Sequence, residues 1–281
     1  MEWFDERLHE GWRQGMRIRE VVFREQTELQ DLLIFDSFDW GRVLALDGVV
    51  QTTTGDEFCY HEMITHVPMM AHGQPQEVLI IGGGDGGCLR EALKHPGVRR
   101  VTQVEIDPGV IALCRRWLPS ISDGAFDHAK AQLVIADGAR FAAESGERFD
   151  VVIVDSTDPI GPGAVLFTEQ FYRACRRLLN PGGILVTQCG NPSIKPQELM
   201  DTQAAQRTAG FTLVDYFLTV VPTYIGGAMA LGFASDDSAA RVLEAEVLRA
   251  RGAPAGLRYW TPEIHVAAFA HPAWMIDRVG H

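Results

Sequence analysis

The sequence predicts an α/β protein, with a doubly wound, parallel sheet that follows a small antiparallel β domain. From Gln74 onward, short apolar runs with strand composition alternate with segments of helical character, the pattern of a parallel sheet with helices on both faces. Residues 16–54, in contrast, show no helical periodicity and contain several strand-like runs. We therefore expect a small β domain over residues 1–55 and a larger domain over 56–281.

The small domain is expected to contain four strands. They are Met16–Arg24, Leu29–Phe35, Arg42–Leu46 and a last strand beginning Val49-Val50-Gln51-Thr52. Asp47-Gly48 separates the last two strands and is a hairpin turn signal. Thr54-Gly55-Asp56-Glu57 then has the spacing of a capping box, which predicts a helix from Phe58 onward. Pro68 limits that helix to one or two further turns.

The larger domain alternates strands and helices. Its predicted strands are Val78–Ile81, Val101–Glu105, Gln132–Ala136, Val151–Asp155 and Ile184–Gln188. Its predicted helices are Cys88–Lys94, Pro108–Leu118 and Phe167–Leu179, the last ending at the turn signal Asn180-Pro181-Gly182-Gly183. Two later strands, Val214–Val221 and Ala228–Ala234, are expected to form an antiparallel edge. A surface helix over 238–250 and a short helix over Pro262–Phe269 complete the chain.

Composition narrows the class of protein. The 281 residues carry a formal charge of −12, which argues against nucleic acid as a partner because phosphates repel an acidic surface. The five cysteines are scattered, without any Cys-x-x-Cys pair, so reduced thiols and no zinc cluster are expected. The N-terminus has no basic segment leading into an apolar run. We therefore expect no signal peptide, no membrane span and a cytoplasmic location.

A glycine-rich turn follows the first strand of the larger domain. Gly82, Gly84 and Gly87 fit the Rossmann-type nucleotide fingerprint, but Asp85 stands inside it. Bare amides at a helix N-terminus favour phosphate, whereas two like charges about 4 Å apart cost roughly 4 kcal/mol at an effective dielectric near 20. The turn therefore favours a nucleoside that carries positive charge, unless Asp85 only caps its own helix.

Acidic residues recur where the predicted parallel strands end. Glu105 follows the glycine turn by about 20 residues, where a carboxylate can accept both ribose hydroxyls. Asp137 and Gly138 close the next strand and could contact an adenine edge, while Asp155 and Asp158 follow the strand after it. Each could be a helix cap or turn former, but together they predict an acidic crevice.

An acidic crevice can bind a metal or an amine. Mg²⁺ usually accompanies phosphate chemistry, and the sequence has no Walker-type lysine, so we expect no metal and a protonated amine instead. An amine with a pKa near 10 must lose a proton before it attacks an electrophile. A carboxylate beside the reacting nitrogen can accept that proton, and other carboxylates can anchor a second ammonium group.

These motifs resemble the spermidine synthase (polyamine aminopropyltransferase) family, in its bacterial branch. The resemblance rests on Val78–Gly87, Gln51 with Asp56-Glu57-Phe58-Cys59-Tyr60-His61-Glu62-Met63, Glu105-Ile106-Asp107, Asp137-Gly138, Asp155-Ser156-Thr157-Asp158-Pro159-Ile160-Gly161-Pro162, Pro222-Thr223-Tyr224 and the tail Tyr259–His265. It implies a methyltransferase-type Rossmann-like fold after a small β domain, assembled as a homodimer or homotetramer. Thr54-Gly55 and Ile225 depart from the pattern of many relatives.

The resemblance also implies a reaction. Decarboxylated S-adenosylmethionine, as co-substrate and with no permanently bound cofactor, would give its aminopropyl group to putrescine, forming spermidine and 5′-methylthioadenosine. Asp155 would accept the proton and contact the amine with Asp158. The implied donor contacts are Gln30, Gln51, Gly82, Asp85, Glu105, Asp137, Gly138 and Pro162, and the other implied amine contacts are Tyr60, His61, Asp85 and Tyr224.

Three other functions fit parts of the sequence. An N-methyltransferase would keep the fold, but the carboxylate of ordinary S-adenosylmethionine would lie beside Asp85. An NAD-dependent oxidoreductase rests on the glycine pattern alone. A protein that only senses nucleosides or polyamines would not need both Asp155 and Asp158. The sequence leaves open the preferred amine, among putrescine, cadaverine, agmatine and longer polyamines, and the subunit number.

Overall fold

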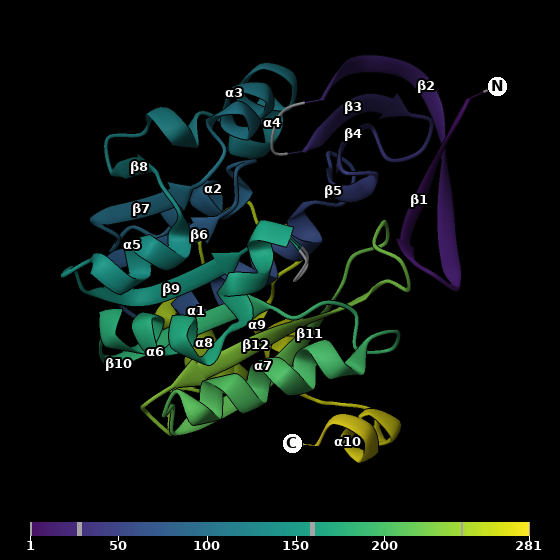
Figure 1. Cartoon of the computed structure of the whole chain (residues 1–281). Helices are drawn as coiled ribbons and strands as arrows, with labels where there is room; N and C mark the ends of the chain where they lie inside the picture. The colour runs from purple at the N-terminus through teal and green to yellow at the C-terminus, as the bar shows by residue number, and fades with distance from the viewer. Residues whose placement is uncertain (1, 27–29, 158–160, 243, 281) are drawn as a thin grey trace.

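The computed structural model describes residues 2–26, 30–157, 161–242 and 244–280. It contains a five-stranded antiparallel sheet, drawn in purple in Figure 1, and a seven-stranded mixed sheet flanked by helices. This confirms the predicted fold class. The two sheets fall on either side of the expected boundary at residues 55 and 56, since the first sheet ends at Thr53.

The small sheet has its strands in sequence order and carries one strand that was not predicted. The strands are β1 (Trp3–His9), β2 (Trp12–Gln26), β3 (Asp31–Ser37), β4 (Arg42–Leu46) and β5 (Val49–Thr53). β1 was missed because charged residues break its apolar pattern. Its Phe4 is nevertheless buried and packs on Phe35, with ring centroids 5.2 Å apart. Leu29, the expected start of the second strand, lies outside the described residues.

The first helix, α1 (Phe58–His72), begins without the predicted capping box. The Thr54 hydroxyl accepts a hydrogen bond from the Arg42 amide instead, and Glu57 occupies the N-cap position with its side chain turned to other partners. The expected limit after Pro68 is confirmed, because α1 ends four residues later at His72 and its C-cap is Gly73, which has φ 89°. Almost every residue of α1 is buried, so this helix belongs to the core.

The main sheet places the glycine turn beside the end of another strand. Its order is β11-β12-β10-β9-β6-β7-β8, in which β6 (Glu77–Gly82) lies between β7 (Arg100–Glu105) and β9 (Phe149–Asp155). β8 (Ala131–Ile135) and β10 (Leu179–Gln188) extend the parallel part. Because β7–β8 and β9–β10 lie on opposite sides of β6, the strand order reverses between β6 and β9, where ligands of open α/β sheets bind. Gly82 pairs with Asp155 at that point.

The predicted antiparallel edge is present. β12 (Ala228–Ser235) runs antiparallel to β10, and β11 (Leu213–Val220) runs antiparallel to β12. The turn signal at residues 180–183 appears as an irregular start of β10, where the pairing with β9 shifts register before Ile184 and Gly182 has φ 77°. The turn signal at residues 180–183 therefore correctly predicted an interruption between the helix and the regular part of the strand.

Helices cover both faces of the main sheet (Figure 1). Alternate strand residues separate the two faces: Val78 and Ile80 pack in the cluster that contains α1 and α2 (Gly87–Leu93), whereas Leu79 and Ile81 pack with α5 (Gly138–Glu144) and α6 (Glu169–Leu178). The remaining helical elements are α3 (Pro108–Trp117), α4 (Pro119–Ser122), η1 (Ala125–Asp127), η2 (Gly161–Phe167), α7 (Pro196–Thr208), α8 (Ala245–Arg251), α9 (Pro262–Ala268) and α10 (Ala273–Val279).

Several helical elements differ from the sequence prediction. The sequence did not predict α4, α5, α7, α10, η1 or η2, and the helix expected over 238–250 is present only as α8. α7 has no clear apolar stripe that would have identified it, although Pro196 at its start and Glu198 in its first turn are helix-start signals. Within the described ranges no helix is long and apolar enough to cross a lipid bilayer. The five cysteines, all of which are described, are buried and free.

Candidate active site

The glycine turn is packed against the end of β9. Gly82 has φ 86°, and a Cβ atom added there would overlap the carbonyl oxygen of Asp155. The amide of Gly83 donates a hydrogen bond of 2.9 Å to that same oxygen. Only glycine combines this left-handed conformation with such close approach of two backbones. The turn therefore fixes the backbone position of Asp155, from which its side chain extends.

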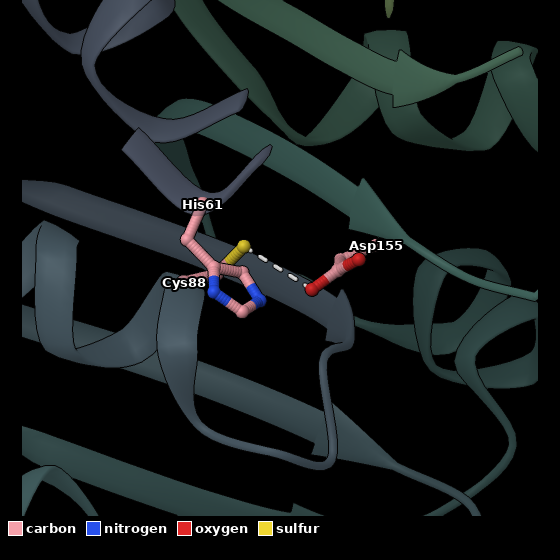
Figure 2. Close-up of side chains that lie close together, drawn as sticks. All are labelled: His61, Cys88 and Asp155. Atoms are coloured by element: carbon pink, nitrogen blue, oxygen red, sulfur yellow. Dashed lines mark hydrogen bonds between the residues drawn. The ribbon is translucent and has the colours of Figure 1, made fainter. Parts of the chain in front are cut away.

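Asp155 receives a hydrogen bond on each carboxylate oxygen. Tyr60 Oη donates to Oδ1 at 2.9 Å. Cys88 Sγ donates to Oδ2 at 3.1 Å, the contact dashed in Figure 2. Burial raises the pKa of Asp155, and the nearby Asp85 raises it further, while His61 and the two donors act in the opposite direction. The result is a half-buried carboxylate with a raised pKa, which suits a general base.

Asp85 is held by both of its oxygens. Oδ1 accepts a hydrogen bond of 2.8 Å from the amide of Gly87, the first residue of α2, whose N-cap is Gly86. Oδ2 lies 3.2 Å from Nε2 of His61. Burial alone would raise the pKa of Asp85, but His61 and the Gly87 amide outweigh burial and hold it below its ordinary value. Asp85 is therefore an anion with a fixed orientation.

His61 lies between two carboxylates. Its Nδ1 is 2.6 Å from Oε2 of Glu57, and its Nε2 faces Asp85. Burial alone would lower the pKa of His61, but Asp85 and Glu57 raise it well above the ordinary value. The ring is an imidazolium that donates from both nitrogens, so its polar atoms are directed at these two acids. The amine contact expected for His61 remains a prediction.

His61, Cys88 and Asp155 also bring three possible metal ligands together, with ligand atoms within 4.8 Å of one another. A metal would need a free nitrogen lone pair and a thiolate. Both nitrogens of His61 face carboxylates, and burial raises the pKa of the Cys88 thiol well above its ordinary value. The donor set fits a hydrogen-bonded network better than a metal centre, and the expectation of no metal stays a prediction.

Glu105 lies against the opposite side of the turn. Its Oε1 accepts a hydrogen bond of 2.9 Å from the Asp107 amide, and its Oε2 would lie 3.1 Å from a Cβ atom on Gly84. Burial raises the pKa of Glu105 to about 7. Gln30 of the small domain contacts the same segment, because its Nε2 donates to Asp107 Oδ2 at 2.9 Å. Gln30 and Glu105 are thus brought to one edge through Asp107, and their contacts with the donor remain predictions.

Asp137 and Gly138 follow β8 at the same edge. The amide of Ala136 donates to the Glu105 carbonyl at 3.0 Å, which sets the ends of β7 and β8 side by side. Asp137 is exposed and caps α5 through the Arg140 amide at 2.9 Å. A Cβ atom on Gly138 would overlap Ile81 on β6. Both residues thus have structural roles here, and their adenine contacts remain predictions.

Tyr224 connects the two domains beside Tyr60, the tyrosine that binds Asp155. Tyr224 Oη donates to the carbonyl of Gln51 at 2.7 Å, and its ring centroid is 6.0 Å from that of Tyr60. The Gln51 side chain donates to Val49 on its own strand at 3.2 Å, so in this structure its backbone, rather than its side chain, makes the link. Pro162 belongs to η2, of which only the backbone is described there, and Asp158 lies outside the described residues.

Sequence reasoning missed two functional candidates. Cys88 was considered only as one of five scattered cysteines, and Arg90, which pairs with Glu57 at 2.9 Å, was not singled out. Both lie on α2 immediately after the glycine turn. Their position on the helix that the turn starts was the available signal, because that helix begins at the ligand-binding edge.

The chain is similar to known proteins over nearly its whole length. The model of the spermine/spermidine synthase domain matches residues 57–244, and the model of the spermidine synthase tetramerisation domain matches residues 2–54. The chain belongs to the spermidine synthase family. Polyamine aminopropyltransferase 1 of Pseudomonas aeruginosa is 51% identical over 280 residues, covering 99% of this chain and 97% of that protein. The polyamine aminopropyltransferase of a Ruegeria species is 52% identical over 275 residues, covering 97% and 96%.

Solved structures of spermidine synthases share the fold. The crystal structure of a spermidine synthase in complex with the transition-state analogue AdoDATO matches with a TM-score of 0.93 and 37% identity, covering 99% of this chain and 95% of the other. The spermidine synthase of Thermotoga maritima matches with a TM-score of 0.90 and 36% identity, covering 99% and 94%. The resemblance found in the sequence is thereby confirmed: the chain is an enzyme of the polyamine aminopropyltransferase class, a transferase of polyamine biosynthesis.

Proposed function

We propose that this enzyme transfers the aminopropyl group of decarboxylated S-adenosylmethionine to putrescine, giving spermidine and 5′-methylthioadenosine. The proposal rests mainly on the position of Asp155. The backbone of Asp155 pairs with the glycine turn where the strand order reverses, and its carboxylate has a raised pKa. A nucleoside on the turn would place its reacting carbon close to this carboxylate.

Asp155 acts in this proposal as the proton acceptor. The attacking nitrogen of putrescine forms a bond to the aminopropyl carbon next to the sulfonium, while the carbon–sulfur bond breaks and its electron pair neutralises the sulfur. The nitrogen gives up one proton, which Asp155 takes. Tyr60 and Cys88 hold the two oxygens of Asp155 in place during the transfer. Asp158, Tyr60, His61 and Tyr224 are the proposed further contacts of the amine.

The donor is proposed to lie across the ends of β6, β7 and β8. Glu105 would accept the ribose hydroxyls, Asp137 and Gly138 would contact the adenine, and Gln30, Gln51, Gly82 and Pro162 would complete the nucleoside site. Asp85 would bind the ammonium of the aminopropyl chain, which favours the decarboxylated donor. Ordinary S-adenosylmethionine would bring a carboxylate against Asp85, and the cost of that approach excludes it.

The small sheet is the proposed assembly surface of a homodimer or homotetramer. The match of residues 2–54 to a domain described as tetramerising supports this proposal. So do several large apolar side chains exposed on the small domain: Trp3, Trp12, Val21 and Phe38. Exposed apolar surface of this kind commonly marks a protein–protein contact. Light scattering coupled to size-exclusion chromatography measures the subunit number directly.

One experiment tests the reaction. The purified protein is incubated with putrescine and either decarboxylated or ordinary S-adenosylmethionine, and the products are identified by mass spectrometry. Spermidine together with methylthioadenosine, formed only from the decarboxylated donor, supports the proposal. Methylputrescine from the ordinary donor would show an N-methyltransferase instead. Parallel reactions with cadaverine, agmatine and spermidine rank the acceptors, and a strong preference for one of these would replace putrescine in the proposal.

A further inference from the structure

A chain of buried ion pairs leads from Asp85 away from the candidate site. Asp85 faces Nε2 of His61, and Nδ1 of His61 faces Glu57. The same carboxylate of Glu57 accepts two contacts from Arg90, at 3.2 Å to Oε1 and 2.9 Å to Oε2. Glu57 and His61 are almost fully buried, and Arg90 is mostly buried. Four alternating charges therefore connect the start of α1 with the turn and α2.

Arg90 is itself fixed from the other side. Its Nε donates to Oε1 of Glu91 at 2.6 Å, and its Nη1 donates to the carbonyl of Ile121. Glu91 also faces Nε2 of His66 at 2.8 Å and Nζ of Lys94 at 2.7 Å. Because these partners hold both ends of the guanidinium, Glu57 cannot follow His61 if the ring moves. The position of the imidazolium is thus set by the protein before any ligand binds.

We propose that Glu57 and Arg90 are positioning residues for the aminopropyl donor: they fix His61, and His61 in turn fixes the carboxylate of Asp85 for the donor's ammonium group. This inference rests on the proposed function, in which Asp85 binds that ammonium. Neither residue was assigned to the donor by the sequence motifs, in which Glu57 was expected to be part of a capping box and Arg90 had no role.

The chemistry requires a charge at Glu57. Charged and titratable groups face His61 from three sides: Glu57 and Tyr60 at the start of α1, Asp85 and Cys88 on the turn and α2, and Asp155 on β9. Without the anion of Glu57, only Asp85 offsets the effect of burial, so the pKa of His61 falls and the imidazolium is less favoured. The contact with Asp85 then loses part of its charge assistance, and Oδ2 is held less firmly in one orientation.

A purely structural role of Glu57 in α1 makes a different prediction. It would alter binding of every nucleoside equally, through general loosening of the site. A positioning role acts on the ammonium alone. Methylthioadenosine shares the nucleoside of the donor and lacks the aminopropyl chain, so the two ligands separate the two roles. The matched control is Glu77→Gln, since Glu77 pairs with Arg100 at 2.8 Å where β6 begins, at the opposite end from the turn.

The experiment compares the parent enzyme, Glu57→Gln and Glu77→Gln by titration calorimetry with both ligands, and by nitrogen-15 NMR of the histidines at pH 8. We expect Glu57→Gln to weaken binding of decarboxylated S-adenosylmethionine about tenfold or more, to leave methylthioadenosine within about twofold, and to reduce the doubly protonated signal of His61. Glu77→Gln should match the parent in all three measurements. Equal weakening of both ligands, or unchanged donor binding in Glu57→Gln, would overturn the inference.

The NMR measurement separates this inference from the proposed function. A parent enzyme that binds ordinary S-adenosylmethionine as tightly as the decarboxylated donor contradicts the role of Asp85, and with it both proposals about the donor. A parent His61 that is singly protonated at pH 8 contradicts only the inference. If Glu57→Gln does not fold, Arg90→Lys replaces it, because lysine keeps the charge and loses the paired contacts. The same selective loss of donor binding is expected there, and its absence counts against the inference.

Discussion

The Sγ atom of Cys88 lies 3.1 Å from Oδ2 of Asp155 and donates a hydrogen bond to it, while Tyr60 occupies the other oxygen. These donors stabilise the charged carboxylate, whereas burial and Asp85 favour its protonated form. The pKa of the proposed base therefore depends on opposing effects. One of them comes from Cys88 on α2, for which the sequence predicted no role. The chemistry of Asp155 can therefore be tested in two ways, by replacing the carboxylate or by replacing one of its hydrogen-bond donors.

The first prediction removes the base. Asp155→Asn keeps the size of the side chain and its contact with Tyr60 but cannot accept a proton from the amine. We expect turnover to fall about 10²- to 10⁴-fold, the usual contribution of a general base, with binding of methylthioadenosine within a few-fold of the parent. Initial rates and calorimetry measure the two effects. Asp236→Asn, at an exposed ion pair with Arg176, is the control and should retain full turnover. Turnover above about a tenth of the parent in Asp155→Asn would exclude the assigned role.

The second prediction concerns Cys88. Loss of its thiol in Cys88→Ala removes a donor from Asp155, so the pKa of Asp155 rises. Asp155 is active as the carboxylate, and the acidic limb of the kcat/KM profile therefore moves to higher pH. We expect about two- to fivefold lower activity on that limb and parent activity well above it, corresponding to about 1 kcal/mol for the lost bond.

Two further variants control this measurement. Cys88→Ser supplies a hydroxyl donor at the same position and should return the limb toward the parent profile. Cys175→Ala empties a similar volume at a fully buried cysteine on α6, which belongs to the cluster on the other face of the sheet, and should leave the limb in place. The groups that face Asp155 are Tyr60, His61, Asp85, Cys88 and Glu105. A limb that does not move in Cys88→Ala would remove the thiol from this set.

Much of the fold was predictable because its strands are buried on both faces. Residues 78–81 and 151–155 form short, continuous apolar runs next to glycine or acidic residues, a pattern that few other structures produce. β1 and α7 were not predictable in this way. β1 buries Phe4 and Glu6 while charged neighbours obscure the alternation, and α7 has apolar and polar residues on all sides. In both cases tertiary packing outweighs the local pattern.

The candidate site was predictable as far as strand ends determine it. Asp155, Glu105 and Gly82 meet because parallel strands carry their carboxyl ends to one edge. The partner of Asp85 was not predictable, because it depends on how α1 packs across α2, and no local spacing encodes that contact. The same packing explains why Glu57 leaves the predicted capping box: His61 and Arg90 bind its carboxylate more strongly than a helix N-terminus would.

The third prediction is a dependence of stability on pH at Glu105. Burial raises its pKa from an ordinary 4.5 to about 7 in the folded protein, so the folded state binds more protons than the unfolded state between these values. Stability from this group is complete below pH 4.5 and is lost as the pH rises through 7, by about 3 kcal/mol in total. Glu105→Gln should remove this loss. Urea unfolding of the ligand-free protein at pH 5 and pH 8 measures the free energy of unfolding for each form.

Other groups also titrate between pH 5 and pH 8, so the informative quantity is the difference in free energy of unfolding between the variant and the parent. Relative to the parent, Glu105→Gln should gain about 2.5 kcal/mol of stability between pH 5 and pH 8, because part of the total loss has already occurred at pH 5. Glu144→Gln, at an exposed pair with Arg140 on α5, should run parallel to the parent across the range. If the free energy of unfolding of Glu105→Gln also changes with pH in parallel with the parent, the Glu105 carboxylate of the parent is ionised at low pH. Burial of Glu105 would then not control its protonation.

The last prediction tests the contact between the turn and β9. Gly82→Ala places a Cβ atom against the carbonyl oxygen of Asp155 in a left-handed conformation, so the turn must move away from β9. We expect a loss of at least about 2 kcal/mol of stability, from the strained backbone and the overlap together. Turnover should fall as well, since the displaced turn carries Asp85 and bears on Asp155. Gly146→Ala is the control, because that glycine has open space and no positive φ, and its stability should stay within about 0.5 kcal/mol of the parent. A Gly82→Ala enzyme with parent stability and parent turnover would mean that the turn is not held by β9.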